Sequence, residues 1–382
     1  MNGPAYPAAR AAASTVEAYF ARNREKALLR NAKNLAPQPD AATIEAIIEA
    51  AFWASLRREE GFSPKISLAF VPPEQAGEPL QFARQLPLTP HNLSRLAPAV
   101  ERPGIHLGVW HAPENKNELT VWGTTRGIPK LCLVLEVIEP GLLVVKYRRG
   151  QDTGKYVNVV VLKGDQIKVV DERGTNLPDC PDLLTSLLDF GARASASDSV
   201  NVLVQLAVSM RSHGRGGLLL VVPHGSETWR ESILQPATYA VSPPYSELAE
   251  LMRQDPSRRT EQTWQEQFID AVDAMAGLTA VDGAALISDQ YELLAFGAKI
   301  VRRLGGVQVE RVILTEPILG GEPAIIPAIE LGGTRHLSAA QFVQDQRGAL
   351  SLVASQDGRF TVLAWSPCEE VVHAHRVESL LL

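Results

Sequence analysis

The sequence predicts an α/β protein in two parts: an α+β N-terminal domain rich in antiparallel hairpins, then a domain whose mixed sheet is covered by helices. The 382 residues exceed what one ordinary hydrophobic core holds. Short β-branched runs broken by Gly, Pro and Asn fill residues 65–171, whereas helical and strand-like segments alternate beyond residue 200. A loop-rich segment separates these two sequence patterns, so we expect two domains.

The N-terminal domain is predicted to span residues 1–190 and to begin with a helical lead-in over residues 1–60. Apolar side chains recur at helical spacing over residues 11–35 and 40–58, and Asp40 is placed to cap the second helix. Strand-like runs follow at residues 66–71, 106–112, 118–124, 131–138, 142–147, 157–163 and 166–172. Turn signals at residues 139–141 and 163–165 join adjacent runs, which favours hairpins in an antiparallel sheet.

The segment from Glu172 to Ser199 is the predicted domain boundary. It contains Gly174, Asn176, Pro178 and Pro181, then a short helical patch from Leu183 to Phe190 and a small-residue run over residues 191–197.

The C-terminal domain is predicted to span residues 195–366, followed by a C-terminal helix over residues 367–382. Helices are expected at residues 200–212, 246–252, 262–275 and from Ser338. Strands are expected at residues 218–222, 283–288, 292–296, 309–314 and 324–330, with a hairpin of residues 350–353 and 360–365. This mixture of helices and strands favours a mixed sheet covered by helices.

Bulk composition excludes several classes of protein. The formal net charge of -6 leaves no basic field for a nucleic acid, so we expect no such partner. Cys132, Cys180 and Cys368 are far apart, odd in number and without CxxC spacing, which argues against a disulfide framework or a thiolate zinc site and fits a reducing cytoplasm. No apolar run approaches the roughly 18 residues that a membrane span needs, so we expect a cytoplasmic protein without a membrane partner.

Asp282, Gly283 and Ala284 form the first candidate site. Asp282 follows a predicted helix and opens an apolar strand, and Gly283 lets another chain or a ligand approach the backbone closely. A carboxylate at such a corner can hold Mg²⁺ or Mn²⁺, because hard divalent cations prefer oxygen ligands. An aspartate that caps a turn explains the same position equally well.

The second candidate site follows about fifty residues later, where Gly332 and Gly333 precede Thr334, Arg335 and His336. The amide groups and side chains of such a loop can meet phosphate oxygens, and the arginine offers a two-pronged contact. A helix after the loop would add the partial positive charge of its N-terminus. A solvated loop without a ligand is the alternative interpretation.

Together these segments resemble diadenylate cyclase domains. Val281-Asp282-Gly283-Ala284 is similar to the family's DGA motif, and Gly333-Thr334-Arg335-His336 is similar to the start of its GTRHR motif. The helix at residues 203–210, the strand at 216–222 and the segment 350–357, which resembles a strand ending in Ser-Glu-Glu, occur in the family's order. The resemblance thus covers about 170 residues, from 200 to 365, and is more specific than either motif alone.

The resemblance implies a set of site residues. Asp282, Gly283, Ala284, Gly333, Thr334, Arg335 and His336 would bind a nucleotide. In an active enzyme Asp282 would be catalytic, and Asp282 with Asp357 would hold Mg²⁺ or Mn²⁺. The fold implied for the C-terminal domain is the mixed sheet of a diadenylate cyclase.

The sequence departs from the family where charge matters. Val281 stands where members commonly have histidine, Leu337 replaces the second arginine of GTRHR, and Gln356 precedes Asp357 where the family has two glutamates. The interval from Arg302 to Ala328 also holds an extra segment. Removal of one charge-stabilising group commonly costs about two to three orders of magnitude in rate. We therefore expect the pocket to bind a nucleotide better than it catalyses a reaction of that nucleotide.

This combination resembles the DAC-like branch described as probable sensor domains, DACNV, in which an N-terminal region precedes the cyclase-like core. The resemblance implies a bacterial signalling protein that senses an adenine nucleotide or a cyclic dinucleotide. An active diadenylate cyclase, which makes cyclic di-AMP from two ATP and needs a head-to-head homodimer, is the alternative. A scaffold that binds nothing is a third. A sensor would need a separate effector protein, because the sequence contains no nuclease, protease or kinase motif.

Two histidine-containing segments invite other interpretations. His373 and His375, with Glu369 and Glu370 nearby, suggest a metal site, but in a helical tail the two histidines point apart and lie on the surface. The segment from His224 to Glu227 suggests a hydrolase, yet it lacks the G-x-S-x-G elbow. In a cyclase-like frame this loop would instead border the purine pocket. Trp110 and Trp122, on paired strands, are expected in the core.

Overall fold

The computed structural model describes residues 5–58, 61–148, 156–171 and 201–382. The chain divides into two compact units, Met1–Val170 with Leu382, and Asp171–Leu381. We call them unit 1 and unit 2 and describe each by itself. The predicted boundary segment at residues 172–199, with its helical patch, lies outside the described residues.

Unit 1 is built on an eight-stranded sheet with the order β2-β4-β3-β1-β5-β6-β7-β8. Its strands are β1 (Ile66–Phe70), β2 (Leu80–Pro87), β3 (His106–His111), β4 (Leu119–Thr125), β5 (Leu133–Glu139), β6 (Leu142–Arg148), β7 (Tyr156–Lys163) and β8 (Gln166–Val169). Its helices are α1 (Pro7–Leu29), α2 (Ala41–Ser55) and α3 (Pro90–Leu96), with short 3-10 turns at Pro73–Gln75 and Ala97–Val100.

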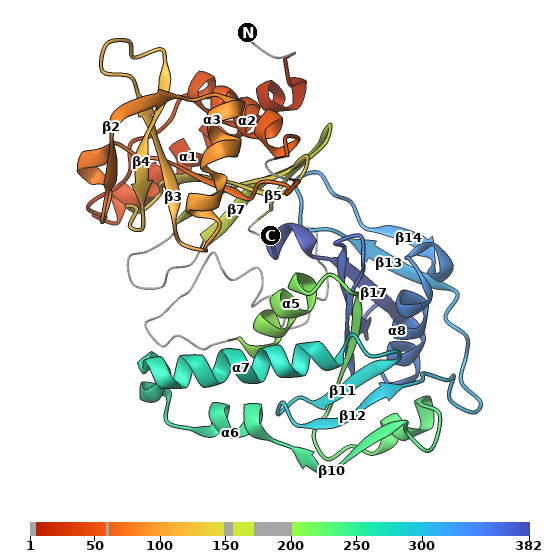
Figure 1. The fold of residues 1–382 in the computed structure, drawn as a ribbon. Helices are drawn as coiled ribbons and strands as arrows, with labels where there is room; N and C mark the ends of the chain where they lie inside the picture. The colour runs from red at the N-terminus through yellow and green to blue at the C-terminus, as the bar shows by residue number, and fades with distance from the viewer. Residues whose placement is uncertain (1–4, 59–60, 149–155, 172–200) are drawn as a thin grey trace. The chain divides into compact units, whose positions relative to one another are not determined.

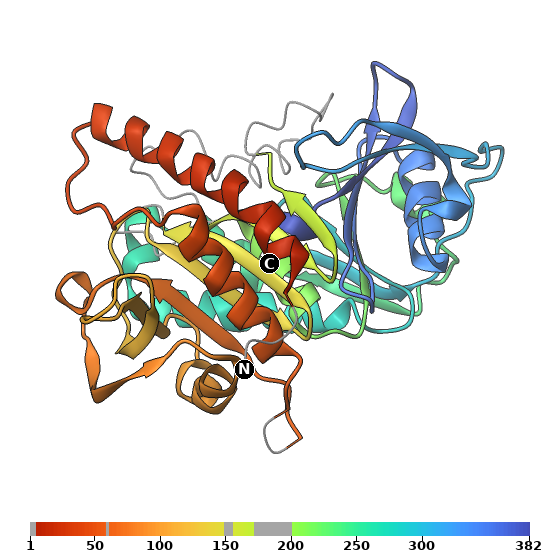
Figure 2. The ribbon, with the colours of Figure 1, turned by 90° about the horizontal axis from the view of Figure 1, so that it is seen from above.

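Helices α1 and α2 cover one face of this sheet, as Figure 2 shows, and bury their apolar stripes in one core with the strands. Asp40 caps α2 as predicted, since its side chain accepts a hydrogen bond from the backbone N–H of Thr43 at 2.8 Å. The predicted turns join β5 to β6 and β7 to β8 in antiparallel hairpins. Trp122 is buried and donates to the Val71 carbonyl, which confirms its place in the core.

The sheet of unit 1 is not purely antiparallel. Strands β1 and β3 pair in parallel, because β2 and α3 form the crossover between them. We did not predict β2 or α3. Strand β2 lies at the edge and its side chains are exposed or half-buried, so its sequence carries no apolar alternation to detect.

A buried histidine makes the stability of unit 1 depend on pH. His106 on β3 is 1% exposed, and its ring contacts Ser67 Oγ at 2.7 Å and Tyr156 Oη at 2.9 Å. Burial, followed by the charges of Lys146 and Arg148, lowers the pKa of His106 to about 4. The neutral form therefore stabilises the folded state above the unfolded pKa of about 6.5, and this contribution is lost as the pH falls toward 4.

We expect acidification from pH 7 to pH 5 to cost about 2 kcal/mol of stability through His106 alone. The variant His106→Gln cannot titrate, so its penalty relative to the wild type should shrink as the pH falls. Urea denaturation of the full chain at both pH values, followed by tryptophan fluorescence, measures this. An unchanged difference between the two proteins at pH 7 and pH 5 would contradict the assignment.

Unit 2 is built on a nine-stranded mixed sheet with the order β10-β12-β11-β9-β15-β16-β17-β13-β14. Its strands are β9 (Gly217–Val222), β10 (Tyr239–Tyr245), β11 (Ala284–Ser288), β12 (Leu293–Ala298), β13 (Arg311–Thr315), β14 (Ala324–Pro327), β15 (Leu350–Ala354), β16 (Phe360–Ser366) and β17 (Val371–Arg376). Its helices are α5 (Val202–Ser212), α6 (Glu247–Arg253), α7 (Gln262–Leu278) and α8 (Thr334–Asp345), with 3-10 turns at Thr228–Ser232, Pro256–Thr260, Ala328–Glu330 and Glu378–Leu380.

Helices cover both faces of this sheet (Figure 1), so its central strands are apolar on both sides. On β9, Leu219 and Val221 pack in the core that contains α5, α6 and α7. The alternate residues Leu218 and Leu220 pack in the core that contains α8. This two-sided burial explains why the segment is a continuous apolar run, and it confirms the predicted mixed sheet covered by helices.

The predicted C-terminal helix over residues 367–382 is wrong. Residues 371–376 form β17, which pairs with β16 on one side and β13 on the other. Val372 and Ala374 enter the core with α8, as alternation along a strand requires. Two partner strands satisfy the backbone of this segment in the extended form: β16 directly precedes it in the sequence, whereas β13 is distant.

The register of unit 2 defines one edge of its sheet. Strands β9 and β11 run parallel with Ala285 opposite Leu219, and the antiparallel β15 places Ala354 opposite Gly217. The antiparallel β12 places Ala298 opposite Ala284. The chain therefore enters β9 and β11 and leaves β12 and β15 at the same edge. We call this the site edge, and it is formed by residues 214–216, 282–283, 299 and 355–359.

Candidate functional site

Both predicted motifs meet at the site edge. Asp282 lies two residues before the start of β11, and Arg335 lies in the first turn of α8. A Cβ added to Gly216 would lie 2.8 Å from Arg335 Nη1, so the guanidinium rests against the backbone that leads into β9. Gly216 has φ +73°, a conformation that side chains rarely adopt. The charge of Arg335 also contributes to the lowered pKa of Asp282, which places the two groups within electrostatic reach.

Asp282 is paired with a residue that we did not predict. Lys299 Nζ lies 2.7 Å from Asp282 Oδ2, and the Asp282 side chain is 96% exposed. The pKa of Asp282 is held below its usual value, first by the hydrogen bond from Lys299 and then by the charges of Lys299 and Arg335. The carboxylate is thus ionised at neutral pH and faces two cations.

Two glycines bring this pair together. A Cβ on Gly283 would lie 2.5 Å from the carbonyl carbon of Gly297, and Gly283 has φ +122°. Gly297 on β12 in turn lies under the ring of Tyr239, because its added Cβ would meet that ring at 2.8 Å. Only glycine fits such close approach of two backbones, so β12 ends against Asp282 and delivers Lys299 there.

An aromatic surface lies next to this pair. The ring of Tyr239 on β10 stacks on Phe296 with ring centroids 4.7 Å apart and an interplanar angle of 17°. Tyr239 remains 49% exposed, so the stack lies at the surface of unit 2. A planar apolar group can pack on such a stack. The sequence of β10 did not predict a strand, because its prolines argue against one. Proline is tolerated in a sheet mainly on an edge strand, and β10 lies at the edge of this sheet.

Helix α8 begins at Thr334, earlier than the predicted start at Ser338. Gly333 occupies the N-cap position with extended backbone, and both Gly333 and Thr334 are exposed. The first N–H groups of a helix have no intrahelical acceptor and carry a partial positive charge. Together with Arg335 they form a surface that suits an anion.

His336 lies elsewhere than the motif resemblance implies. It is 4% exposed, and its Nε2 is 3.3 Å from Thr361 Oγ1. Burial, followed by the charge of Arg376, lowers the pKa of His336 and favours the neutral ring. A Cβ on Gly332 would lie 2.6 Å from its Nδ1, so the ring packs under the glycine loop and fixes its shape. Leu337 packs against the core that contains α8.

The hairpin after β15 completes the site edge. A Cβ added to Gly216 would lie 3.3 Å from Gln356 Cγ and 2.8 Å from Arg335 Nη1, so Gln356 and Arg335 lie beside the same glycine. Gln356 Nε2 also donates a hydrogen bond to the Arg215 carbonyl at 3.3 Å. Asp357 Oδ2 pairs with Arg359 Nε at 3.3 Å.

The side chains at the site edge do not fit a divalent cation. Asp282 and Asp357 each pair with a basic side chain, Lys299 and Arg359. Within the described ranges of the chain, no group of three or more His, Cys, Asp or Glu side chains is arranged to hold a metal ion. The site edge instead presents a surplus of cationic groups, which suits an anionic ligand.

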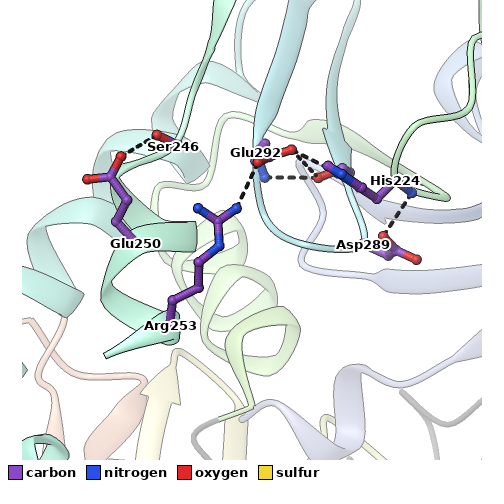
Figure 3. A network of polar contacts seen from close by, with 7 residues as sticks. His224, Ser246, Glu250, Arg253, Asp289 and Glu292 are labelled. Carbon is purple, nitrogen blue, oxygen red and sulfur yellow. Dashed lines mark hydrogen bonds and ion pairs between the residues drawn. The ribbon is translucent and has the colours of Figure 1, made fainter. Parts of the chain in front are cut away.

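The loop after β9 lies at the opposite end of the strands. Figure 3 shows His224 and Arg253 converging on Glu292, with His224 Nδ1 at 3.0 Å and Arg253 Nη2 at 2.9 Å from the carboxylate. The backbone N–H of His224 donates to Asp289 at 2.9 Å. Since β9 separates His224 from Gly216 by about 20 Å, at roughly 3.3 Å per residue, this loop does not lie at the site edge, and its place beside a purine pocket stays a prediction.

A cavity of about 570 Å³ also lies at that opposite end. Its lining includes Val222, Thr228, Arg303 and Arg347. These residues surround the end of β9 and the carboxyl end of α8, whereas Arg335 lies at the amino end of α8. The site edge is therefore an open surface separate from this cavity.

His373 and His375 are buried, not on the surface as predicted. They lie on the same face of β17 with ring centroids 5.7 Å apart. His373 Nε2 contacts Glu369 Oε2 at 2.6 Å, and His375 Nδ1 contacts Thr315 Oγ1 at 2.6 Å. Burial, followed by the charge of His373, lowers the pKa of His375 to about 3, so this ring is neutral.

None of the helices in the described part of the chain is both long and apolar enough to cross a membrane.

Comparison with known proteins finds a family model that matches part of the chain. Residues 33–126 match the family described as "Probable sensor domain DACNV". This segment runs from before α2 through β4 in unit 1, whereas the motifs that resemble diadenylate cyclases lie in unit 2. Among solved structures, a double mutant of DacA from Staphylococcus aureus is similar at 16% identity over 42% of this chain and 77% of that chain, with a TM-score of 0.21. No curated protein sequence matches the chain.

Proposed function

We propose that this chain, whose residues 33–126 match the DACNV family of probable sensor domains, senses an adenine nucleotide or a cyclic dinucleotide through unit 2. The convergence of Arg335, Lys299 and Asp282 at one edge of the sheet carries the proposal. The resemblance of these segments to the DGA and GTRHR motifs of diadenylate cyclases supplies the class of ligand.

The ligand's phosphate is held by three groups in this proposal. The Arg335 guanidinium can make a two-pronged contact, the first N–H groups of α8 point toward the same anion, and Lys299 adds a mobile ammonium. Asp282 accepts hydrogen bonds from the ribose hydroxyls. The base packs on the stack of Tyr239 and Phe296, because aromatic faces accept planar bases.

Binding without turnover is the better account of these residues. Attack of a ribose hydroxyl on a phosphate develops negative charge that an enzyme must neutralise. Leu337 is packed against the core where the cyclase motif has an arginine, and Gln356 is neutral where that motif has a glutamate. Each missing charge costs about two to three orders of magnitude in rate. The signal then passes to a separate effector protein.

Incubation of the full chain with ATP and Mn²⁺, with chromatography for cyclic di-AMP and calorimetry on the same sample, tests this proposal. We expect saturable heat for ATP or cyclic di-AMP and no product. Product that disappears in Asp282→Asn would favour an active cyclase, whose subunits would act as a dimer. The absence of both heat and product would leave only a scaffold.

A further inference from the structure

We infer that Lys299 occupies the place of a divalent cation at the site edge, so that unit 2 binds a phosphodiester such as a cyclic dinucleotide without metal. This rests on the proposed function and goes further, because it selects among the nucleotides. In this inference the Lys299 ammonium stands in place of the Mg²⁺ or Mn²⁺ that the motif resemblance implies.

The first support is the position of the ammonium. Lys299 Nζ is 2.7 Å from Asp282 Oδ2, the oxygen that a bound cation would need. The position follows from the backbone: Ala298 pairs with Ala284, and Gly283 packs on Gly297, so the residue after β12 must emerge beside Asp282. The strand register thus brings the two residues close enough to pair.

The second support is the local charge. Two cations lie near Asp282 at the site edge: Lys299 contacts its carboxylate, and Arg335 rests against Gly216. One carboxylate against two cations leaves a positive surface, which repels a second cation and attracts an anion. Asp357, the other predicted metal ligand, is engaged with Arg359.

The third support is the exposure of Lys299. Its side chain is 45% exposed, so the ammonium has donors available for a ligand while it contacts Asp282. Because Lys299 is paired with Asp282, the charge of Arg335 is left uncompensated at this pair, and a phosphodiester carries only one negative charge per phosphate. A triphosphate carries about four charges and is normally bound together with Mg²⁺. The site edge therefore favours a cyclic dinucleotide over ATP.

The sequence offers a specific probe, because Lys299 is the only lysine after Lys168. Reductive methylation with ¹³C gives each lysine a methyl signal and keeps its charge, and the Lys299 signal is the one missing from Lys299→Arg. Mn²⁺ bound at Asp282 would broaden this signal, because a paramagnetic ion relaxes nearby nuclei. We expect Mn²⁺ alone to leave the Lys299 signal no broader than those of the other lysines. Selective broadening would overturn the inference.

Titration with cyclic di-AMP in EDTA tests the binding itself. We expect a saturable shift of the Lys299 signal and a Kd within about twofold of that in Mg²⁺. A shift that needs Mg²⁺ would overturn this inference and leave the proposed function standing. The absence of a shift and of calorimetric heat in both buffers, for cyclic di-AMP and ATP alike, would overturn the proposed function itself.

Substitution separates a ligand contact from a structural role. Lys299→Met should weaken cyclic di-AMP binding in EDTA about tenfold or more, and Mg²⁺ should then restore part of it, because Asp282 is freed. Lys299→Arg should retain most of the affinity. The matched control is Arg258→Met, which removes an exposed cation paired with Glu261. Equal losses in the Arg258 and Lys299 variants would contradict a specific role for Lys299.

Discussion

Replacement of Arg335 by alanine should weaken nucleotide binding between about tenfold and a hundredfold. A hydrogen bond to a charged group contributes about 1.5–3 kcal/mol, and each 1.4 kcal/mol is about tenfold in affinity. Arg335 rests against Gly216 beside Asp282, so its loss removes the charge nearest the start of α8. Calorimetry with cyclic di-AMP at fixed ionic strength measures the change.

Two further variants give this prediction its controls. Arg335→Lys keeps the charge but loses the two-pronged geometry, so we expect an intermediate affinity. Arg258→Ala removes an exposed arginine that pairs with Glu261 and should bind like the wild type. An Arg335→Ala protein that binds within about twofold of the wild type would show that the ligand does not contact this guanidinium.

Replacement of Gly283 by valine should destabilise unit 2 by about 3 kcal/mol or more and abolish nucleotide binding. A Cβ at this position would lie 2.5 Å from the carbonyl carbon of Gly297, and the backbone has φ +122°. The only relief is separation of β11 from β12, which also separates Asp282 from Lys299. Urea denaturation of the full chain followed by tryptophan fluorescence measures the loss.

The control for this strain is Gly305→Ala. Gly305 also has a positive φ, +75°, but an added Cβ there would meet no atom within 4 Å. Its cost should therefore be the backbone penalty alone, about 1 kcal/mol. If Gly283→Val were no more harmful than Gly305→Ala, the close contact of β11 with β12 would be disproved.

Local patterns predicted a large part of the fold. Tight turns with glycine join β5 to β6 and β7 to β8, and β9 is a continuous apolar run because both of its faces are buried. Each of these patterns can be recognised within a short, contiguous stretch of the sequence. The segments around Asp282 and Arg335 were also recognisable, because each motif is short and contiguous.

The remainder depends on strand register. Strand β17 lies between β16 and β13, and β13 is far from it in the sequence, so local spacing could not distinguish it from a helix. Lys299 is seventeen residues from Asp282, and only the pairing of Ala284 with Ala298 brings the two together. The register of the β11–β12 hairpin shifts twice between the turn and Ala284, so counting residues outward from the turn does not place Lys299 beside Asp282.

His336 illustrates the limit of a motif match. The residue type agrees with the cyclase motif, but the ring is buried against Thr361 beneath Gly332. Side-chain direction within the first turn of α8 decides between contact with a ligand and packing, and a motif does not specify it.

A crystal structure of the full chain grown with cyclic di-AMP in EDTA would show where the ligand binds. We expect density for the ligand at the site edge, with a phosphate between Arg335 and Lys299 and a base on Tyr239. Ligand density in the cavity at the carboxyl end of α8, with the site edge unchanged, would contradict this expectation.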